Sequence, residues 1–239
     1  MSGPLDGIDL VVFDKDGTLL DFHAMWGGWA IELGRRLDGA ARRPVSGDVF
    51  AAIGFDPTSG RARPGGPLAV DTMSQIRERI AAVVRRWCPS VAAARQVVEV
   101  AWFVPDPVAT AVPLADLPSL FGALREGGRI VTVATTDDRA PTDATLRELG
   151  VRELVSAIAC GDDGIGVKPD PAMVLALCHA TRIAPDRTVV IGDTLADLQM
   201  ARDAGVRRAI GVLSGVDDAD TLGPAADLLL PSIADLAVN

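Results

Sequence analysis

The chain has 239 residues, 49% of them hydrophobic and 23% charged, which suffices for a buried core and excludes disordered and low-complexity classes. Its 23 basic and 32 acidic residues give a formal net charge of −9, so we expect neither nucleic acid nor an anionic membrane as a partner. No apolar run reaches the roughly 18–20 residues of a membrane span, and the N-terminus lacks the basic start of a signal peptide. Three widely spaced cysteines fit a reducing compartment, so we expect a soluble cytoplasmic protein.

The first predicted element is a strand at residues 10–13, and a segment of different composition follows it. All four tryptophans lie between residues 22 and 103, and residues 20–112 hold eleven arginines against nine acidic residues. Helical periodicity predicts helices at 24–38, 46–54, 71–87 and 90–103, with a Gly- and Pro-rich loop over 56–67. Ser46, Asp71 and Ser90 are the expected N-caps, and Pro105, Pro107 and Pro113 end the segment. We therefore predict a helical insert over 21–112 within a core formed by 1–20 and 113–239.

After the insert, short apolar runs alternate with helical patterns. Strands are predicted at 130–134, 157–160, 189–191, 209–212 and 228–230. Helices are predicted at 117–126, 142–149, 171–181 and 195–204, with a short one after Ser232. This alternation predicts an α/β fold, a Rossmann-like doubly wound parallel sheet with helices on both faces. Ligands of such sheets bind at the carboxyl ends of the strands.

The first strand leads directly into Asp14-Lys15-Asp16-Gly17-Thr18. Two carboxylates at i and i+2, just past a buried strand, can face one crevice, while Gly17 permits the turn and Thr18 can hydrogen-bond back to hold it. An acidic turn without function is the alternative at this position.

Three later segments place polar residues in similar positions. Thr135 and Thr136 follow the strand at 130–134, and Asp193 follows the strand at 189–191, with Asp197 in the next helical turn. Lys168 precedes a proline that is expected to open a helix. It is one of only two lysines, against 21 arginines, which favours a specific need for a compact charge. Taken singly, helix capping or a solvated loop explains each segment.

Taken together, these strand ends would bring four carboxylates and a lysine into one crevice. Such a cluster of like charge needs a cation, and oxygen ligands without nearby His or Cys favour Mg²⁺ over zinc. The cation would also let an acidic protein hold a phosphate dianion.

These motifs, in this order, resemble those of the haloacid dehalogenase (HAD) superfamily of phosphohydrolases. The segments that carry the resemblance are Asp14-x-Asp16-Gly17-Thr18 and Gly192-Asp193-x-x-x-Asp197, with Thr135 and Lys168 between them. A helical cap inserted after the first motif is typical of one large branch of the superfamily. Thr18-Leu19-Leu20-Asp21 and Ala204-Gly205-Val206 are similar to phosphoglycolate-phosphatase-type members.

The resemblance implies a catalytic role for four residues. Asp14 would be the nucleophile that forms an aspartyl-phosphate, and Asp16 would protonate the leaving oxygen and later deprotonate the water. Thr135 would hydrogen-bond a phosphoryl oxygen, with Thr136 in support, and Lys168 would neutralise charge between the nucleophile and the phosphate.

The resemblance also implies a metal site. Asp193, a carboxylate oxygen of Asp14 and the backbone carbonyl of Asp16 would ligate Mg²⁺. Asp197 would ligate through water or orient Lys168. The carboxylate at Asp16 indicates phosphate esters, because superfamily dehalogenases and phosphonate-cleaving members lack a carboxylate there.

The leading function is thus a Mg²⁺-dependent phosphatase of small phosphorylated metabolites, such as phosphoglycolate-like compounds or sugar phosphates. A phosphosugar mutase of the β-phosphoglucomutase type is an alternative with the same chemistry, and a non-catalytic binding module is another. Within the insert, Arg61 and Arg63 are candidate contacts for a substrate carboxylate or a second phosphate, with plain surface charge as the favoured alternative. A homodimer through the tryptophan-rich insert stays open.

Overall fold

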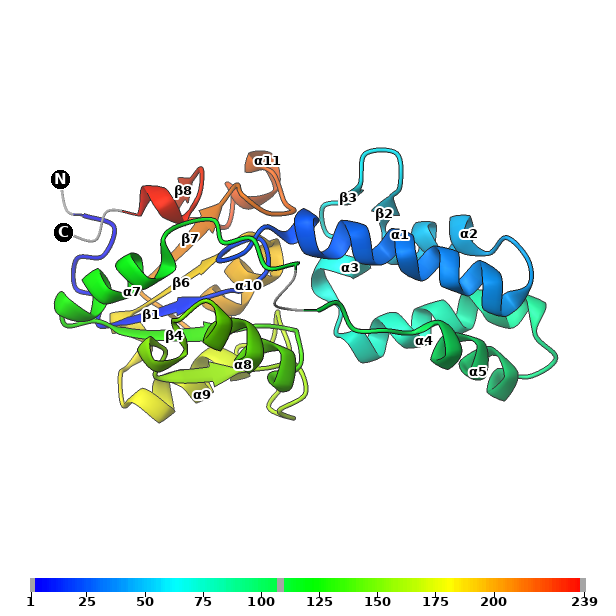
Figure 1. The fold of residues 1–239 in the computed structure, drawn as a ribbon. Helices are drawn as coiled ribbons and strands as arrows, with labels where there is room; N and C mark the ends of the chain where they lie inside the picture. Colours follow the sequence, from blue (N-terminus) through cyan, green and yellow to red (C-terminus); the bar gives the residue numbers. More distant parts are fainter. Residues whose placement is uncertain (1–2, 107–109, 237–239) are drawn as a thin grey trace.

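The computed structural model describes residues 3–106 and 110–236, and a six-stranded parallel sheet organises them (Figure 1). The strand order is β5-β4-β1-β6-β7-β8. The chain leaves the central strand β1 toward β4 and β5 on one side and later returns to β6 on the other, so a topological switch point lies at β1. The strand bounds are β1 Leu10–Phe13, β4 Ile130–Ala134, β5 Ala157–Ala159, β6 Thr188–Gly192, β7 Arg208–Val212 and β8 Leu228–Leu230.

Helices cover both faces of the sheet, as predicted. Val11 and Phe13 pack into one apolar cluster with α7 (Leu117–Glu126) and α8 (Arg139–Glu148), and the Phe13 ring stacks on Phe121 at 5.3 Å. Leu10 and Val12 point the other way, toward α9 (Ala172–Thr181) and α10 (Leu195–Asp203). Alternate side chains of a fully buried strand therefore serve two cores, and the α/β doubly wound prediction is confirmed.

Short elements complete the core. The helix α11 spans Ala219–Leu222, and the expected short helix after Ser232 is a 3₁₀ turn, η4, at Ile233–Asp235. The remaining 3₁₀ turns of the described core are η2 (Arg152–Leu154) and η3 (Pro185–Arg187).

The segment between β1 and α7 contains helices that lie beside the sheet rather than on its faces (Figure 1). Its longest helix, α1 (Phe22–Ala41), is capped by Asp21, which accepts hydrogen bonds from the backbone N–H groups of His23 and Ala24. The other elements described there are α2 (Ser46–Ile53), β2 (Phe55–Asp56), β3 (Arg61–Ala62), α3 (Pro67–Val70), α4 (Met73–Val84), η1 (Arg85–Trp87) and α5 (Val91–Ala101).

Aromatic packing holds this segment together. The Trp29 ring meets Trp26 and Trp102 edge to face, each at 5.4 Å between centroids, and its indole N–H donates to the Phe103 carbonyl at 2.9 Å. These contacts join α1 to the end of α5, so three of the four tryptophans form a local core, while Trp87 is exposed.

Several local predictions for this segment are wrong. The predicted loop over 56–67 contains the β2–β3 hairpin and leads into α3. Ser46 does not cap α2, because its hydroxyl donates to Asp38; Asp71 does not cap α4, because Thr72 does so in a capping box with Gln75. Ser90 caps α5 as predicted. Of the three prolines, Pro107 lies outside the described residues.

Two adjacent stretches of the chain, one leaving the sheet and one returning to it, connect this segment to the sheet. A bridge pairs Leu20 with Pro113, and the backbone N–H of Asp21 donates to the Val112 carbonyl at 2.8 Å. Because the chain leaves and re-enters at one place, a cap over 21–112 could rotate about this double connection. That division of the chain stays a prediction.

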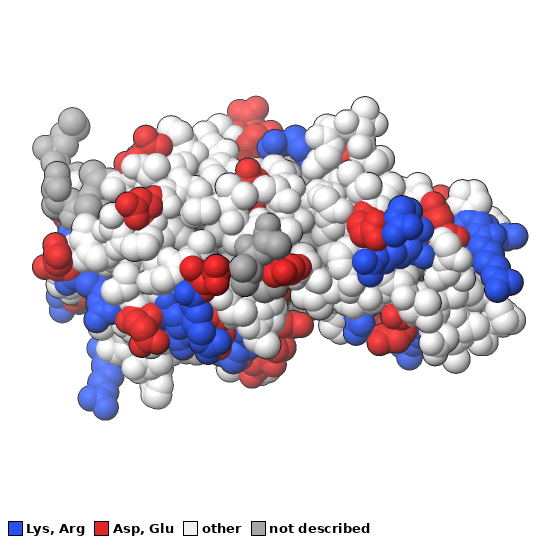
Figure 2. All heavy atoms as spheres, in the orientation of Figure 1, with Lys and Arg blue, Asp and Glu red and all other residues white. Residues whose placement is uncertain are grey.

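Charged side chains of both signs share the surface. Figure 2 shows Lys and Arg beside Asp and Glu at both ends of the molecule on the face drawn. On α1, Glu32 pairs with Arg35 and Arg36, each at 2.7 Å, and such exposed pairs add little stability. Among the helices of the described residues, none combines the length and the apolarity that crossing a bilayer requires.

Candidate active site

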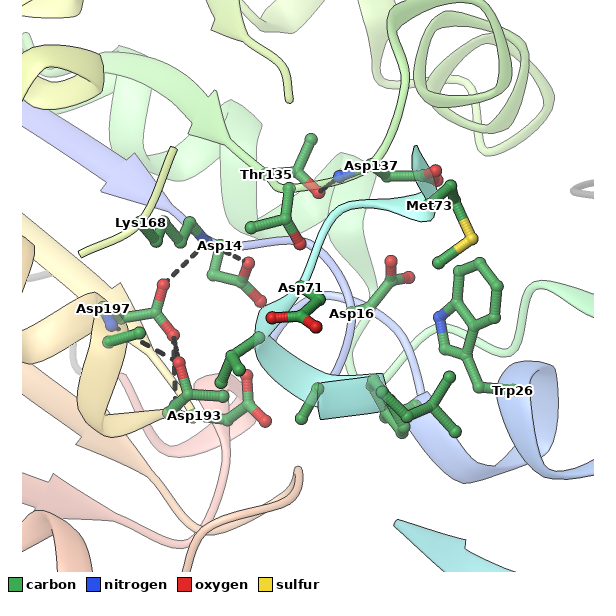
Figure 3. Close-up of a pocket in the computed structure, with 17 residues that line it drawn as sticks. Asp14, Asp16, Trp26, Asp71, Met73, Thr135, Asp137, Lys168, Asp193 and Asp197 are labelled. Atoms are coloured by element: carbon green, nitrogen blue, oxygen red, sulfur yellow. Dashed lines mark hydrogen bonds and ion pairs between the residues drawn. The ribbon is translucent and has the colours of Figure 1, made fainter. Parts of the chain in front are cut away.

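The predicted strand-end residues meet in one pocket at the switch point (Figure 3). β1 pairs with β6 so that Phe13 lies opposite Ile191, and the backbone N–H of Asp14 donates to the Ile191 carbonyl at 2.9 Å. This register places Asp14 beside the end of β6, where Asp193 follows. The predicted residues that line the pocket are Asp14, Asp16, Thr135, Thr136, Lys168, Asp193 and Asp197.

Lys168 is the cation at the centre of this pocket. Its ammonium contacts Asp14 Oδ1 in a short ion pair and Asp197 Oδ1 at 2.6 Å (Figure 3). Burial lowers the pKa of Lys168, but Asp14 and Asp197 outweigh burial and leave that pKa above its ordinary value. Lys168 is therefore charged at neutral pH and joins two carboxylates that would otherwise repel.

Asp14 is held at one oxygen and left open at the other. Lys168 contacts Oδ1, whereas the buried Oδ2 has no hydrogen-bond partner among the described residues. Burial raises the pKa of Asp14 to about 6, against the lowering effect of Lys168 and with a further rise from Asp197. An unpaired buried carboxylate oxygen is costly in a folded protein, which indicates that it has a partner or a chemical role.

Asp193 is fully buried and held by its neighbours in the fold. Its Oδ2 accepts a hydrogen bond from the Val216 backbone N–H at 2.9 Å, and its Oδ1 accepts one from the Thr18 hydroxyl at 3.4 Å. Burial raises the pKa of Asp193 well above its ordinary value, and the charges of Asp14 and Asp197 add to that rise. A nearby cation would favour its ionised form.

The three carboxylates can share such a cation. One oxygen each from Asp14, Asp193 and Asp197 lies within 4.8 Å of the others, and all three residues are buried. A Cβ atom on Gly17, whose φ is +100°, would lie 2.3 Å from an Asp193 oxygen, and one on Gly215 would lie 1.9 Å away. Both glycines thus allow close approach of the backbone to Asp193. This set of carboxylate oxygens, with no His or Cys among the ligands, fits Mg²⁺.

Asp197 has its second oxygen engaged. Oδ2 accepts hydrogen bonds from the Thr194 hydroxyl at 2.6 Å and the Thr194 N–H at 3.1 Å, which forms a capping box at the start of α10. One oxygen of Asp197 thus caps the start of α10, and the other contacts Lys168.

Asp16 lies on the other side of the pocket, beside a second buried lysine. Lys15 donates to both oxygens of Asp16 at 2.7 and 2.6 Å and pairs with Asp137 at 3.3 Å. Burial lowers the pKa of Lys15, but Asp16 and Asp137 outweigh it and raise that pKa overall. The sequence did not reveal this role for the Lys15 side chain or for Asp137, because the two residues lie far apart in the sequence and no local pattern links them.

Thr135 presents its hydroxyl near Asp137. The Asp137 N–H donates to Thr135 Oγ1 at 3.1 Å, so that oxygen acts as an acceptor and its proton stays available to a further group. Thr136 also lines the pocket, and its carbonyl packs against Gly161, where a Cβ would lie 2.2 Å away.

The loop after β7 supports the site and was missed by sequence reasoning. Ser214 donates from its hydroxyl to the Gly17 carbonyl at 2.8 Å, and Val216 contacts Asp193 as described. The buried Asp217 accepts from the Leu195 N–H at 2.7 Å and from the Gly65 N–H at 2.9 Å, which joins the core to the inserted segment. The only local signal was a glycine in Leu213-Ser214-Gly215-Val216, directly after a predicted strand.

The inserted segment covers the pocket from the other side. Its contributing side chains come from α1 and from the stretch around α3 and the start of α4, and the enclosed space is only about 30 Å³. That is room for about two waters. The residues of this covering wall are Phe22, Trp26, Leu68, Ala69, Val70, Asp71 and Met73.

The sequence matches the family model of the haloacid dehalogenase-like hydrolases over residues 8–205. It is 30% identical to a phosphoglycolate phosphatase of Rhodospirillum rubrum over 52% of this chain and 56% of that protein. It is 24% identical to a phosphorylated carbohydrates phosphatase of Thermotoga maritima over 93% and 94% of the two chains. The chain spans about half the length of the first curated relatives that it matches.

A solved structure is similar along almost the whole chain. The crystal structure of a predicted phosphoglycolate phosphatase from Haemophilus somnus gives a TM-score of 0.68 with 17% identity, over 96% of each chain. At this identity the likeness shows the fold alone.

Proposed function

The chain belongs to the haloacid dehalogenase-like hydrolases, and on that basis we propose that it is a Mg²⁺-dependent phosphatase that hydrolyses small phosphate monoesters through an aspartyl-phosphate on Asp14. The observation that carries the proposal is the buried, unpaired Oδ2 of Asp14, in a pocket that also holds Lys168 and Asp16. Curated relatives named as phosphatases of phosphoglycolate and of phosphorylated carbohydrates support this substrate class.

In the first step Asp14 Oδ2 would attack phosphorus while the bond to the leaving oxygen breaks. Lys168 holds Oδ1, which leaves Oδ2 as the free nucleophilic oxygen. With its pKa near 6, Asp14 is ionised at neutral pH even before a cation binds. The nucleophile therefore needs no separate base.

Asp16 would act as the general acid and then as the general base. It gives a proton to the leaving alcohol oxygen in the first step and takes one from the attacking water in the second. That water attacks phosphorus, the bond to Asp14 breaks and phosphate leaves. Lys15 donates to both oxygens of Asp16, so Asp16 must turn away from Lys15 to reach the leaving oxygen.

The metal would be held by Asp14, Asp193 and Asp197 or by the predicted set of Asp14, Asp193 and the Asp16 carbonyl. When bound, Mg²⁺ supplies positive charge that offsets the charge developing on the transferring phosphoryl group. Lys168 adds a second positive charge, and the Thr135 hydroxyl donates a hydrogen bond to a phosphoryl oxygen.

The inserted segment would act as a cap that excludes water during transfer. The space at Asp14 is too small for a phosphate monoester, so the cap must open about its double connection to admit substrate. Asp217, which contacts Gly65 of the cap, would help to hold the closed state.

A direct test is phosphate release from a panel of phosphate monoesters with Mg²⁺ and with a chelator, for the wild type and Asp14→Asn. We expect metal-dependent release that falls at least 1,000-fold in Asp14→Asn, since the amide is a poor nucleophile. Isomerisation of a sugar phosphate without net release would instead establish a mutase. Release that Asp14→Asn leaves unchanged would reject Asp14 as the nucleophile.

A further inference from the structure

We propose that Asp71, on the cap, makes the enzyme select phosphate monoesters whose leaving group carries hydroxyl groups and no anion, and disfavour leaving groups with a carboxylate. This inference rests on the proposed phosphatase function. It names sugar and polyol phosphates as the preferred substrate class and phosphoglycolate-like compounds as the disfavoured one.

Asp71 lies on the cap wall of the same pocket that holds Asp14 and Asp16. It follows α3 and precedes Thr72, the residue that caps α4. Its side chain is only 12% exposed, and Figure 3 shows its carboxylate in the opening with Asp14 and Asp16. The phosphoryl group is expected at Asp14, so a cap residue opposite it faces the leaving group.

The Asp71 carboxylate has one oxygen fixed and one available. Arg79 of α4, eight residues further along the chain, holds Oδ2 in a short ion pair, and the Arg79 side chain is 49% exposed. Oδ1 receives no hydrogen bond from the described residues. It is therefore an oriented acceptor, and a leaving-group hydroxyl could donate to it.

The pocket offers no free cation for a second anion. Among the described residues that line it, Lys168 is the one cation, and Asp14 and Asp197 already engage it. Arg61 and Arg63, the cap arginines suggested by the sequence, are exposed and do not line the pocket. A carboxylate on the leaving group would thus meet the Asp71 carboxylate with no available cation among the described lining residues, since Arg79, which pairs with Asp71, does not line the pocket.

The neighbouring chamber holds two cations, and each already has an acidic partner among the described residues. It has a volume of about 260 Å³, and its apolar wall includes Trp26 and Met73, which it shares with the catalytic pocket. Lys15 pairs with Asp16, while Arg77 lies over the Trp102 ring, pairs with the exposed Glu99 and keeps a buried Nε without a hydrogen-bond partner among the described residues. The N-terminus of α4 carries partial positive charge from the helix dipole, but the Asp71 carboxylate lies next to it in the chain and offsets that charge.

The experiment uses substrate pairs that differ only at the anion. These are 2-hydroxyethyl phosphate against phosphoglycolate, and glycerol 3-phosphate against 3-phosphoglycerate, with kcat/KM measured for each. For the wild type we expect the neutral member of each pair to be favoured at least tenfold. In Asp71→Asn, which keeps the size of the side chain, that ratio is expected to fall at least tenfold, with most of the change in the carboxylate substrates.

Two control variants separate charge in the pocket from charge on the cap surface. Glu78→Gln removes an exposed carboxylate that pairs with Arg95 on the outside of the cap, and it should leave the ratio unchanged. Arg79→Gln removes the partner of Asp71 and should keep or increase the preference for neutral substrates.

A ratio that Asp71→Asn changes less than twofold, or a wild type that prefers the carboxylate members, would overturn the proposal. Failure of the proposed function would look different, because the wild type would then release phosphate from no monoester at all, glucose 6-phosphate included.

Discussion

Two glycines determine how closely the backbone approaches Asp193. Gly17 belongs to the first motif and has a positive φ, so the sequence could assign it a turn; Gly215 lies about two hundred residues later and contacts the same carboxylate. Strand-end carboxylates were predictable because they follow apolar runs locally. The loop after β7 was not, because its contacts, from the Val216 N–H to Asp193 and from the Ser214 hydroxyl to Gly17, are made with residues distant in the sequence.

The Gly215 contact gives a sharp prediction at this scale. In Gly215→Ala the new methyl group would lie 1.9 Å from Asp193 Oδ2, so the carboxylate must shift. We expect the Mg²⁺ concentration for half-maximal activity to rise at least tenfold. Gly122→Ala, on α7 with open space around it, is the matched control and should leave metal dependence unchanged. Equal metal dependence in both variants would show that the Gly215 contact is unimportant.

The scarcity of lysine in the sequence indicates that the two lysines have specific roles, and the structure shows which residues they contact. Both lysines of the chain are buried in ion pairs: Lys168 between Asp14 and Asp197, and Lys15 between Asp16 and Asp137. The scarcity of lysine singled out Lys168 from the sequence. The Lys15 side chain is buried, and no local sequence pattern predicts its pairing with Asp137, which is distant in the sequence.

At the scale of elements, helix positions in the cap were predictable and their exact ends were not. Asp71 and Thr72 are both good capping residues, and only the backbone path after α3 decides that Thr72 caps α4. The β2–β3 hairpin has two residues in each strand, too few for a periodic pattern. Asp71 itself was misassigned as a cap, and its position in the pocket followed only from the structure.

Helix α1 provides a pair of glycines that tests cap packing. A Cβ on Gly34 would lie 2.5 Å from the Phe50 ring of α2, whereas one on Gly28 would meet nothing within 4 Å. Gly34→Ala should therefore destabilise the protein by about 1–3 kcal/mol through overpacking. Gly28→Ala should stabilise it by about 0.5–1 kcal/mol, because alanine is the better helix former. Thermal or urea unfolding measures both, and equal effects would contradict close α1–α2 packing.

At the scale of the whole molecule, the ionised forms of the buried carboxylates in the site destabilise the metal-free fold, and a bound cation would stabilise them. Asp14 and Asp193 both have raised pKa values in the folded chain, and burial is the main cause. A carboxyl whose folded pKa lies above its unfolded value costs stability once the pH exceeds the unfolded value. For the metal-free protein this cost grows as the pH rises from about 4 toward neutrality.

Asp193→Asn should expose this cost. In the presence of a chelator at pH 7.5, we expect the variant to be more stable than the wild type by about 1 kcal/mol or more, and the difference should shrink toward pH 4. Saturating Mg²⁺ should reverse the order, because the wild type binds the cation more tightly. Urea unfolding at several pH values provides the measurement. A variant that is less stable than the wild type at pH 7.5 without metal would contradict this account of Asp193.

The central claim is that phosphate passes through Asp14, and chemical trapping tests it most directly. During turnover of a good phosphate monoester, the reaction is quenched in acid, reduced with borohydride and digested, and the peptide that contains residues 10–20 is analysed by mass spectrometry. The account predicts conversion of Asp14 to homoserine, as expected for a reduced acyl-phosphate, only in samples with substrate and Mg²⁺. Active enzyme that releases phosphate while position 14 is never modified, or that carries the modification at Asp16 instead, would contradict it.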